Sequence, residues 1–174
     1  MRWLTYLVKC LFCGFVAMQV YFALQITLWT FFDPSSTAFQ RAERWRLCSW
    51  HWSCPVYSEW TPYDKISNLL KRAVLVSEDD IFFQHNGFRF EDMKKAWEKN
   101  QQKTQAGNSS KTALRGGSTI TQQLAKNLFL SSEQNYFRKG QEFVITGLLE
   151  LILSKQRLFE IYLNSVEWGE GIFG

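Results

Sequence analysis

Residues 115–130 read RGGSTITQQLAKNLFL, and this stretch decides the fold class. Two glycines allow a close approach of the backbone, and the hydroxyl of Ser118 or Thr119 can begin a helix. Apolar side chains then recur at helical spacing, at Ile120, Leu124 and Leu128. The pattern predicts a capped helix whose apolar face packs in the core of a mainly α domain.

Four further segments around this helix carry helical patterns. They are residues 61–77, 90–102, 136–154 and 155–164. No segment has a sustained period of two and none is repeated, so the predicted fold class is mainly α. Residues 103–117 are polar and contain Gly and Ser, which predicts a loop.

The first of these helices is predicted to begin at Thr61-Pro62-Tyr63-Asp64, which offers an N-cap hydroxyl, a proline at the first position and an acid. It should place Glu78 at its carboxyl end, before a turn at Asn86-Gly87. Its expected apolar face comprises Ile66, Leu69, Leu70, Ala73 and Val74. The corresponding faces of the other three are Phe90, Met93 and Trp97; Phe143, Leu148, Leu151 and Ile152; and Leu158, Ile161 and Tyr162.

The amino-terminal segment is long and apolar enough to cross a membrane. Residues 10–32 contain no charged side chain, and a helix of this length, at about 1.5 Å per residue, covers a hydrocarbon core of about 30 Å. Trp3 and Trp29 lie where interfacial anchors would. A cleaved signal peptide has an apolar run of only about 7–15 residues. We therefore expect a retained, single transmembrane helix within residues 1–32.

The sequence after this span leaves three alternatives open. Basic residues flank the span almost equally, so charge does not decide its orientation. The six aromatic residues of segment 33–60 suit either the headgroup zone or packing against the domain. Cys48 and Cys54 form a disulfide if that side is oxidising and are free thiols otherwise. We divide the chain into an anchor (1–32), a juxtamembrane interfacial segment (33–60) and a domain (61–174).

Composition excludes several classes of protein. With 46% hydrophobic and 17% aromatic residues, the 174-residue chain can bury a core, which excludes long disorder. Its 10 Gly and 3 Pro exclude a collagen-like fibre, and its 4 Cys show no zinc-binding spacing. A net charge of +4 is too small to indicate nucleic acid, so we expect no nucleic-acid partner.

The first candidate constellation for chemistry is SEDDIFFQHNGF, at residues 77–88. Its three consecutive acids precede an apolar Ile-Phe-Phe, and a carboxyl group against apolar walls has a raised pKa that suits a general acid or base. Alternatively, Ser77 caps a short helix and the acids stabilise its positive end. His85 is a second polar candidate, or hydrogen-bonds a neighbouring backbone group.

The second constellation is the opening of the helix at 115–130. Its free N–H groups attract anions, and Gln122, Gln123, Lys126 and Asn127 add donors within two turns. Such a set suits a diphosphate or a sugar rich in hydroxyls, although it is not a Walker A loop. The alternative is a plain capped helix.

The third constellation is FRKGQEF, at residues 137–143. Arg138, Lys139 and Glu142 can share one helix face, where two cations and a carboxylate could hold phosphate directly or through Mg²⁺. The alternative is a surface ion pair worth only about 0.2–1 kcal/mol.

Together these stretches resemble the peptidoglycan glycosyltransferase family, in its monofunctional form, the biosynthetic peptidoglycan transglycosylases. Four motifs carry the resemblance. They are Glu78-Asp79-x-x-Phe82-x-x-His85-x-Gly87; Gly117-Ser118-Thr119-Ile120-Thr121-Gln122-Gln123 followed by Lys126-Asn127; Arg138-Lys139-x-x-Glu142; and Lys155-x-Arg157 followed by Tyr162-Leu163-Asn164.

The resemblance implies a lysozyme-like α-helical glycosyltransferase domain on the periplasmic side of the bacterial inner (cytoplasmic) membrane. It would polymerise glycan strands from lipid II by inverting transfer of the lipid-linked chain to the acceptor 4-hydroxyl, releasing undecaprenyl diphosphate. Its partners would be lipid II, the growing lipid-linked strand, the membrane and proteins of cell-wall synthesis or division.

The resemblance also implies roles for single residues. Glu78 would be the general base, and Glu142 a second catalytic carboxylate that organises cations or a divalent metal, Mg²⁺ or Mn²⁺, around the diphosphate. The remaining residues implied in substrate binding are Asp79, His85, Ser118, Thr119, Gln122, Gln123, Lys126, Asn127, Arg138 and Lys139.

Two departures from the family pattern bear on these expectations. Gln134 stands where the family usually has an arginine, and an amide cannot neutralise phosphate. The chain ends at Gly174, where relatives continue, so we expect a domain truncated at its C-terminus. Two alternatives to polymerisation follow: a lysozyme-like enzyme that cleaves glycans, or a truncated, non-catalytic membrane-bound binding protein.

Overall fold

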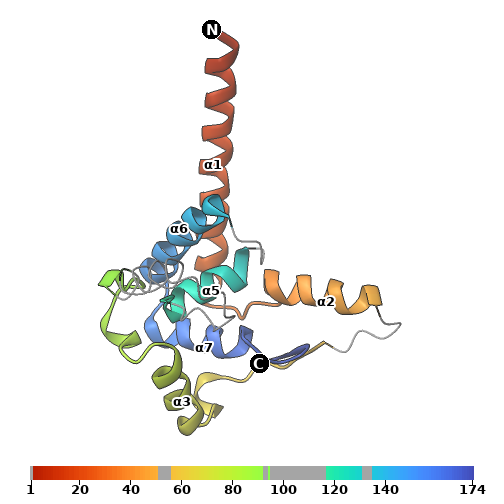
Figure 1. The fold of residues 1–174 in the computed structure, drawn as a ribbon, viewed down its shortest axis with the longest axis vertical. Helices are drawn as coiled ribbons and strands as arrows, with labels where there is room; N and C mark the ends of the chain where they lie inside the picture. Colours follow the sequence, from red (N-terminus) through yellow and green to blue (C-terminus); the bar gives the residue numbers. More distant parts are fainter. Residues whose placement is uncertain (1, 51–55, 92–93, 95–116, 131–134) are drawn as a thin grey trace, which may run out of the picture.

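The computed structural model describes residues 2–50, 56–91, 94, 117–130 and 135–174. Helix α1 (Arg2–Leu28) projects as a stalk from a helical body, and α3 lies at the opposite end of that body (Figure 1). The other helices are α2 (Ala38–Trp50), α3 (Asn68–Glu78), α5 (Ile120–Phe129), α6 (Tyr136–Ile152) and α7 (Lys155–Ser165), with 3-10 turns η1 (Tyr63–Lys65) and η2 (Phe82–Gln84). The prediction of a mainly α fold is confirmed.

Helix α5 is the centre of the body. It packs against α2, α6 and α7, and its apolar residues Ile120, Leu124 and Leu128 are buried, as predicted. Around them lie Ile145 and Leu149 of α6, together with Leu158, Phe159, Ile161 and Tyr162 of α7. The helix that the sequence marked most clearly is therefore the one on which the others assemble.

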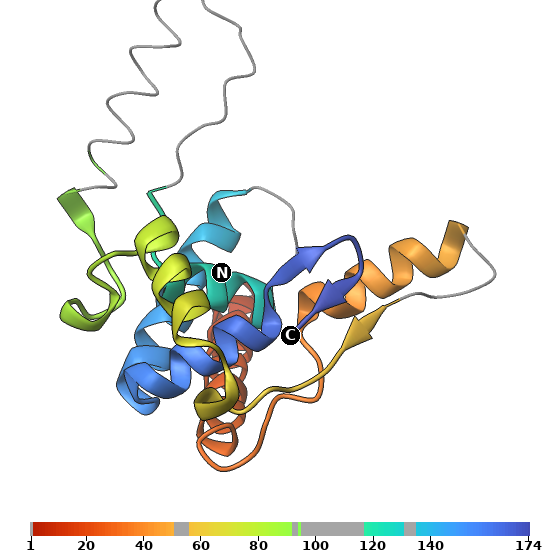
Figure 2. The ribbon, with the colours of Figure 1, turned by 90° about the horizontal axis from the view of Figure 1, so that it is seen from below.

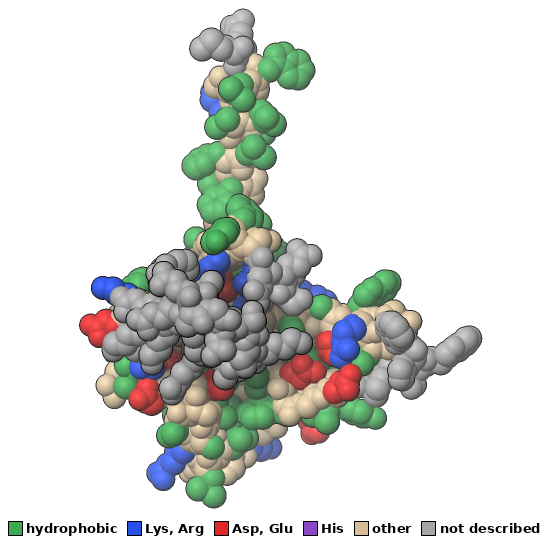
Figure 3. Space-filling view, in the orientation of Figure 1, with side chains coloured by type: hydrophobic (Ala, Val, Ile, Leu, Met, Phe, Trp, Pro, Cys, Tyr) green, Lys and Arg blue, Asp and Glu red, His purple; other side chains and the backbone are tan. Residues whose placement is uncertain are grey.

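Helix α1 is both a candidate span and a part of the fold. The segment Trp3–Leu28 is long and apolar enough to cross a membrane, and most of it stands clear of the body (Figure 3). From Met18 onwards, however, α1 packs against the body, where Phe22 and Ile26 belong to the buried core. The side-chain amides of Gln19 and Gln141 exchange hydrogen bonds of 3.3 and 3.0 Å, which joins α1 to α6.

Arg157 clamps the end of α1 to the body. Its guanidinium donates to the backbone carbonyls of Trp29 and Phe32 and to the carboxylates of Asp33 and Glu160, at 2.8–2.9 Å. It also lies over the ring of Trp60, 5.3 Å from the centroid. The two carbonyls belong to the turn that follows α1, so this arginine ties that turn to α7.

The start of α3 differs from the prediction. The proline turn forms only the 3-10 turn η1, the chain is extended at Ile66, and α3 begins at Asn68. Thr61 does not cap a helix, because its backbone N–H and C=O both bond the side chain of Asn164, at 2.7 and 2.9 Å. The prediction that the helix delivers Glu78 at its end is confirmed.

Two predicted apolar faces are partly wrong. On α3, Ile66 and Val74 are buried, but Leu69 is 78% exposed and Leu70 40% exposed. The residue that is buried next to these two leucines is Lys71, whose ammonium lies 4.0 Å above the ring of Tyr63. On α6, Leu151 is 82% exposed, whereas the buried face holds Gln141, Glu142 and Thr146 beside the core aliphatics. Polar side chains that have partners elsewhere in the fold therefore occupy buried positions on both helices, and the leucines expected there are exposed.

A small sheet completes the body, and the sequence did not predict it. Its order is β1–β3–β2, with β1 (Tyr57–Ser58) parallel to β3 (Ile172–Phe173) and β2 (Glu167–Gly169) antiparallel to it. Strands of two or three residues are too short for any alternation to be visible.

Helix α2 and strand β1, from the described parts of segment 33–60, lie on the side of the body that carries the sheet (Figure 2). Phe39 of α2 meets Phe173 of β3 with ring centroids 6.2 Å apart, while Trp45 is 79% exposed. Cys48 is disulfide-bonded, and Cys10 and Cys13 are free. Packing against the domain therefore holds for part of the segment, and the boundaries at 32 and 60 stay predictions.

Several predictions fall on residues outside those described. They concern Cys54, Gln134, most of the helix expected at 90–102 and, apart from Gly117, the loop expected at 103–117. Residues 90, 91 and 94 of that helix are described, and they are helical.

We expect Arg157→Ala to destabilise the chain by about 1.5–3 kcal/mol, because charge-assisted hydrogen bonds to the end of α1 are lost. Arg157→Lys should recover only part, since an ammonium cannot reproduce the planar fork. Thermal unfolding in detergent micelles measures the effect. Arg72→Ala, at an exposed arginine of α3, is the control; equal losses at both positions would refute the clamp.

Candidate functional site

Glu78 is the last residue of α3 and is exposed to solvent. Its carboxylate accepts a hydrogen bond of 2.9 Å from the side-chain amide of Gln123 on α5. The apolar walls expected around it are absent among the described residues, because Phe82 turns into the core instead. The structure corrects the prediction of a buried carboxyl group at this position.

A short hydrogen-bond chain holds Glu78 in place. The hydroxyl of Tyr162 on α7 donates to the amide oxygen of Gln123 at 3.2 Å, and the amide nitrogen of Gln123 donates to Glu78. Burial, and then the negative charge of Glu78, raise the pKa of the Tyr162 phenol well above its ordinary value. The phenol therefore remains protonated and keeps donating to Gln123, so three helices meet at this carboxylate.

Asp79, the next residue, is buried, and both of its carboxylate oxygens accept hydrogen bonds. It is 1% exposed, and its oxygens accept hydrogen bonds from His85 Nε2 at 2.8 Å, Arg89 Nη1 at 3.3 Å and the backbone N–H of Ile120 at 3.2 Å. Because Nδ1 of His85 accepts the N–H of Gly87 at 3.0 Å, Nε2 carries the proton that faces Asp79. The carboxylate thus joins the end of α3, the following turn and the start of α5.

The start of α5 is satisfied from within the protein. Thr119 and Gln122 form a capping box, each side chain bonding the other's backbone N–H. The Asp79 carboxylate accepts a hydrogen bond from the N–H of Ile120 and lies at the positive end of the helix. The N–H groups of Ile120 and Gln122 are therefore bonded within the protein, and Thr119 is the cap. The role of the rest of this motif in binding a diphosphate or a sugar stays a prediction.

The turn after η2 is packed closely onto α6. Gly87 has φ = +81°, and a Cβ there would lie 2.8 Å from Glu150 Cγ, so only glycine fits. Its carbonyl accepts the hydroxyl of Thr119 at 2.7 Å. The predicted turn at Asn86-Gly87 is confirmed. The alternative that Ser77 caps a helix here is wrong, because Ser77 lies within α3.

Sequence reasoning missed a partly buried carboxylate, that of Glu150. It accepts hydrogen bonds from the hydroxyl of Thr121 and from Lys155 Nζ, the latter at 2.8 Å. The Lys155 ammonium also lies 4.4 Å above the ring of Phe82. Glu150 occupies a helical position next to Leu151 and Ile152, and no local pattern distinguishes it from a surface acid.

The third constellation forms one cluster on α6, as predicted. Arg138 Nη1 donates to Glu142 at 3.1 Å, and Lys139 also bonds this carboxylate. Glu142 is buried, with 4% of its side chain exposed, whereas Lys139 is 39% exposed. Arg138 Nε is buried and has no hydrogen-bond partner among the described residues. A buried carboxylate with two cations differs from the exposed surface pair that was the alternative.

The other predicted site residues lie on or just before α5. Lys126 and Ser118 are partly exposed, and Asn127 is buried. Lys126 and Asn127 follow Gln123 by three and four residues, so all three share one helix face, the face that reaches Glu78. Among the described residues no hydrogen bond or ion pair links the Glu78 chain to the Arg138–Glu142 cluster. Their facing each other across one cleft stays a prediction.

The described residues do not form a metal site of their own. They contain no group of three or more His, Cys, Asp or Glu side chains that could hold an ion. The predicted ligand Glu142 has both cations on its carboxylate. A divalent metal does not fit this pairing.

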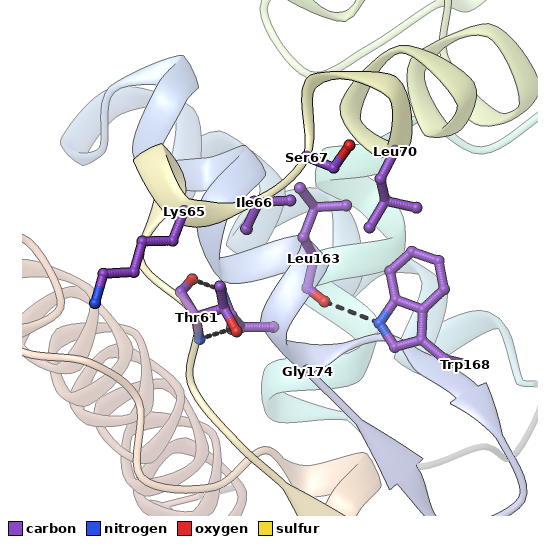
Figure 4. Close-up of a pocket in the computed structure, with 9 residues that line it drawn as sticks. Thr61, Lys65, Ile66, Ser67, Leu70, Leu163, Trp168 and Gly174 are labelled. Carbon is purple, nitrogen blue, oxygen red and sulfur yellow. Dashed lines mark hydrogen bonds between the residues drawn. The ribbon is translucent and has the colours of Figure 1, made fainter.

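A cavity of about 390 Å³ lies elsewhere, at the amino-terminal end of α3 (Figure 4). Its lining comprises Thr61, Lys65, Ile66, Ser67, Leu70, Leu163, Asn164, Trp168 and Gly174. Glu78 is at the other end of α3, about 15 Å away along the helix axis. Since the lining contains no carboxylate, the cavity does not supply a general base.

Comparison with known proteins identifies close relatives. The Transglycosylase family model matches residues 50–174. The chain is 63% identical to the biosynthetic peptidoglycan transglycosylase of Cupriavidus metallidurans, over the whole of this chain and 72% of that relative. It is 58% identical to the protein of the same name from Cupriavidus pinatubonensis, over all of this chain and 67% of the relative. The corresponding protein of Ralstonia nicotianae is 53% identical, with 72% of its length covered.

We expect Asp79→Asn to lower the free energy of unfolding by about 3–5 kcal/mol, because it leaves Arg89 and the start of α5 without their buried counter-charge. The neighbouring Asp80 is 62% exposed and bonds only Arg89 among the described residues. Asp80→Asn is therefore the matched control and should cost less than about 1 kcal/mol. Denaturant unfolding measures the loss of unfolding free energy in both variants. Similar losses would contradict a stabilising role for the hydrogen bonds of Asp79.

Proposed function

This chain belongs to the biosynthetic peptidoglycan transglycosylase family, and on that premise we propose how its residues act. It is a glycosyltransferase that polymerises glycan strands in peptidoglycan synthesis. Lipid II and the growing strand are its substrates. The roles of single residues, the orientation in the membrane and the protein partners are our proposals.

Glu78 acts as the general base. The observation that supports this role is that the three consecutive acids, residues 78–80, have different hydrogen-bond partners. Asp79 bonds His85 and Arg89, and Asp80 bonds Arg89, whereas the described partner of Glu78 is the neutral amide of Gln123. No described cation pairs with this carboxylate, and its exposure leaves it accessible to a hydroxyl group.

The proposed reaction is a single displacement. Glu78 takes the proton of the acceptor 4-hydroxyl, whose oxygen forms a bond to the anomeric carbon of the lipid-linked chain. The bond from that carbon to the diphosphate oxygen breaks, its electron pair leaves with the diphosphate, and the configuration inverts. Negative charge develops on the diphosphate, where positioned cations stabilise the transition state most.

Arg138 and Lys139 supply those cations, with Glu142 holding both in place. Lys139 is exposed enough to reach a ligand, and Arg138 has an unpartnered Nε. Lys126 lies on the face of α5 that reaches Glu78 and adds a third positive charge. A divalent cation at Glu142 remains a prediction that the described pairing does not favour.

The other predicted binding residues form two groups, those whose polar groups are bonded within the protein and those that can reach a substrate. Asp79, His85, Thr119 and Gln122 serve as positioning residues, because their polar groups are occupied within the protein. Ser118, Gln123 and Asn127 lie on or just before the helix that reaches Glu78 and line the substrate site.

The domain lies on the periplasmic side of the bacterial inner membrane, with α1 as its single anchor. The disulfide at Cys48 supports that side, since disulfides persist in oxidising compartments. Proteins of cell-wall synthesis or division are the proposed further partners.

A lysozyme-like hydrolase is the competing activity. Its chemistry needs a protonated acid beside a second carboxylate or water, and it has no use for cations at a diphosphate. Labelled lipid II distinguishes the two, because a polymerase lengthens strands and a hydrolase shortens finished ones. A non-catalytic binding protein would do neither.

We expect Glu78→Gln to reduce the rate of lipid II polymerisation by about 10²–10⁴-fold, because the proton acceptor is lost while the shape and the bond to Gln123 can persist. The control is Glu59→Gln, the same change at an exposed carboxylate. Polymerisation by the full chain in detergent or vesicles, with labelled lipid II, measures both. An unchanged rate for Glu78→Gln would remove the base assignment.

A further inference from the structure

Tyr162 is a buried residue of α7 whose phenol hydroxyl reaches the candidate site. The residue is 2% exposed and belongs to the core, where its ring stacks with that of Phe159, with centroids 6.5 Å apart. A buried hydroxyl needs a hydrogen-bond partner, and the side-chain amide oxygen of Gln123 supplies one at 3.2 Å. The sequence predicted Tyr162 only as part of an apolar helix face, which leaves its hydroxyl without a role in the reaction.

The negative charge of Glu78 decides the direction of the hydrogen bonds that join it to Tyr162. An ionised carboxylate only accepts hydrogen bonds, so the amide nitrogen of Gln123 faces Glu78 and the amide oxygen faces the phenol. Because burial, and then the charge of Glu78, raise the pKa of the phenol, Tyr162 stays protonated and donates to that oxygen. A hydroxyl group of the core therefore fixes which end of the Gln123 amide faces the carboxylate.

Glu78 is held by one of its two carboxylate oxygens. Oε2 accepts the hydrogen bond of 2.9 Å from Gln123, whereas Oε1 accepts none from the described residues. The hydrogen bonds of Asp79 fix the backbone at this end of α3, but the side chain of an exposed glutamate keeps several rotamers unless a contact selects one. Within the described part of the chain, the bond to Gln123 is therefore the contact that limits where Oε1 lies.

We infer that Tyr162 is a positioning residue for the reaction, which acts through the Gln123 amide to hold the open oxygen of Glu78 in one place. The inference rests on the proposed role of Glu78 as the general base. A general base works only within hydrogen-bond reach of the proton that it removes, and a small displacement lowers the rate steeply. The hydroxyl of Tyr162 therefore contributes to kcat, although it contacts neither the substrate nor Glu78 directly.

Helix α7 is a rigid support for such a residue. Arg157, near its start, bonds the turn that follows α1, and Asn164, near its end, bonds the backbone of Thr61 at 2.7 and 2.9 Å. Tyr162 lies between these two attachments, and α7 packs directly on α5, the helix that carries Gln123. A side chain on a helix attached in this way holds its partner more precisely than one on a loop.

We expect Tyr162→Phe to lower kcat for lipid II polymerisation by about tenfold to a hundredfold with little change in KM, because the base is misplaced while the buried ring is kept. The assay uses the full chain in detergent with labelled lipid II. Tyr57→Phe is the matched control, the same change at a tyrosine of β1 that is 69% exposed. Thermal unfolding of both variants measures any loss of folded protein.

The pH profile of kcat/KM separates positioning from a structural role. A carboxyl group that loses a hydrogen bond to its charged form takes up a proton at higher pH. The acid limb of the profile should therefore move to higher pH in Tyr162→Phe, whereas a smaller folded fraction would lower the rate equally at every pH. The charged groups around Glu78 are the same in both variants; they are Asp79, Asp80 and Arg89, and Lys126 of α5.

A double-mutant cycle tests whether Tyr162 acts through Gln123. In a Gln123→Met background, which keeps the length of the side chain and removes the amide, Tyr162→Phe should cause no further loss of kcat. Additive losses would overturn the inference, as would a Tyr162→Phe variant with an unchanged kcat or an unmoved acid limb while Glu78→Gln is inactive. If Glu78→Gln itself polymerises at the original rate, the general base and the positioning role both fail.

Discussion

The buried carboxylate of Asp79 is the interaction on which the rest of the site depends. It accepts from His85, from Arg89 and from the first N–H of α5, while 1% of the residue is exposed. A buried charge is tolerated only when it is paired and hydrogen-bonded, so these partners must be placed together for the body to fold. The same arrangement brings the end of α3, and with it Glu78, next to α5.

Helix α1 belongs to the fold in the same sense. Arg157 bonds the carbonyls of the turn after α1, and the side-chain amides of Gln19 and Gln141 join α1 to α6. Buried Phe22 and Ile26 of α1 add apolar contacts with the core. The orientation of α1 relative to the body is therefore determined by side chains within the body.

The two charged groups proposed for catalysis are built differently. Glu78 is exposed and held by neutral hydrogen bonds, a setting that leaves a carboxylate free to accept a proton. Glu142 is buried between Arg138 and Lys139, a setting that neutralises it and orients the cations. Two carboxylates thus acquire different roles from their surroundings.

Local signals in the sequence determined the helices other than α2, which was not predicted. They also determined the Thr119 cap, the glycine turn at Gly87 and the shared face of Arg138, Lys139 and Glu142, because each depends on neighbours within about four residues. Three of the four family motifs contain these features. The exposed setting of Glu78, the bonds of Glu150 to Thr121 and Lys155, and the clamp at Arg157 were decided only in the tertiary structure. Their partners lie up to 128 residues away, and no periodicity records which distant group will meet a buried charge. For that reason Leu69 and Leu151 were expected in a core where Lys71 and Glu142 are found instead.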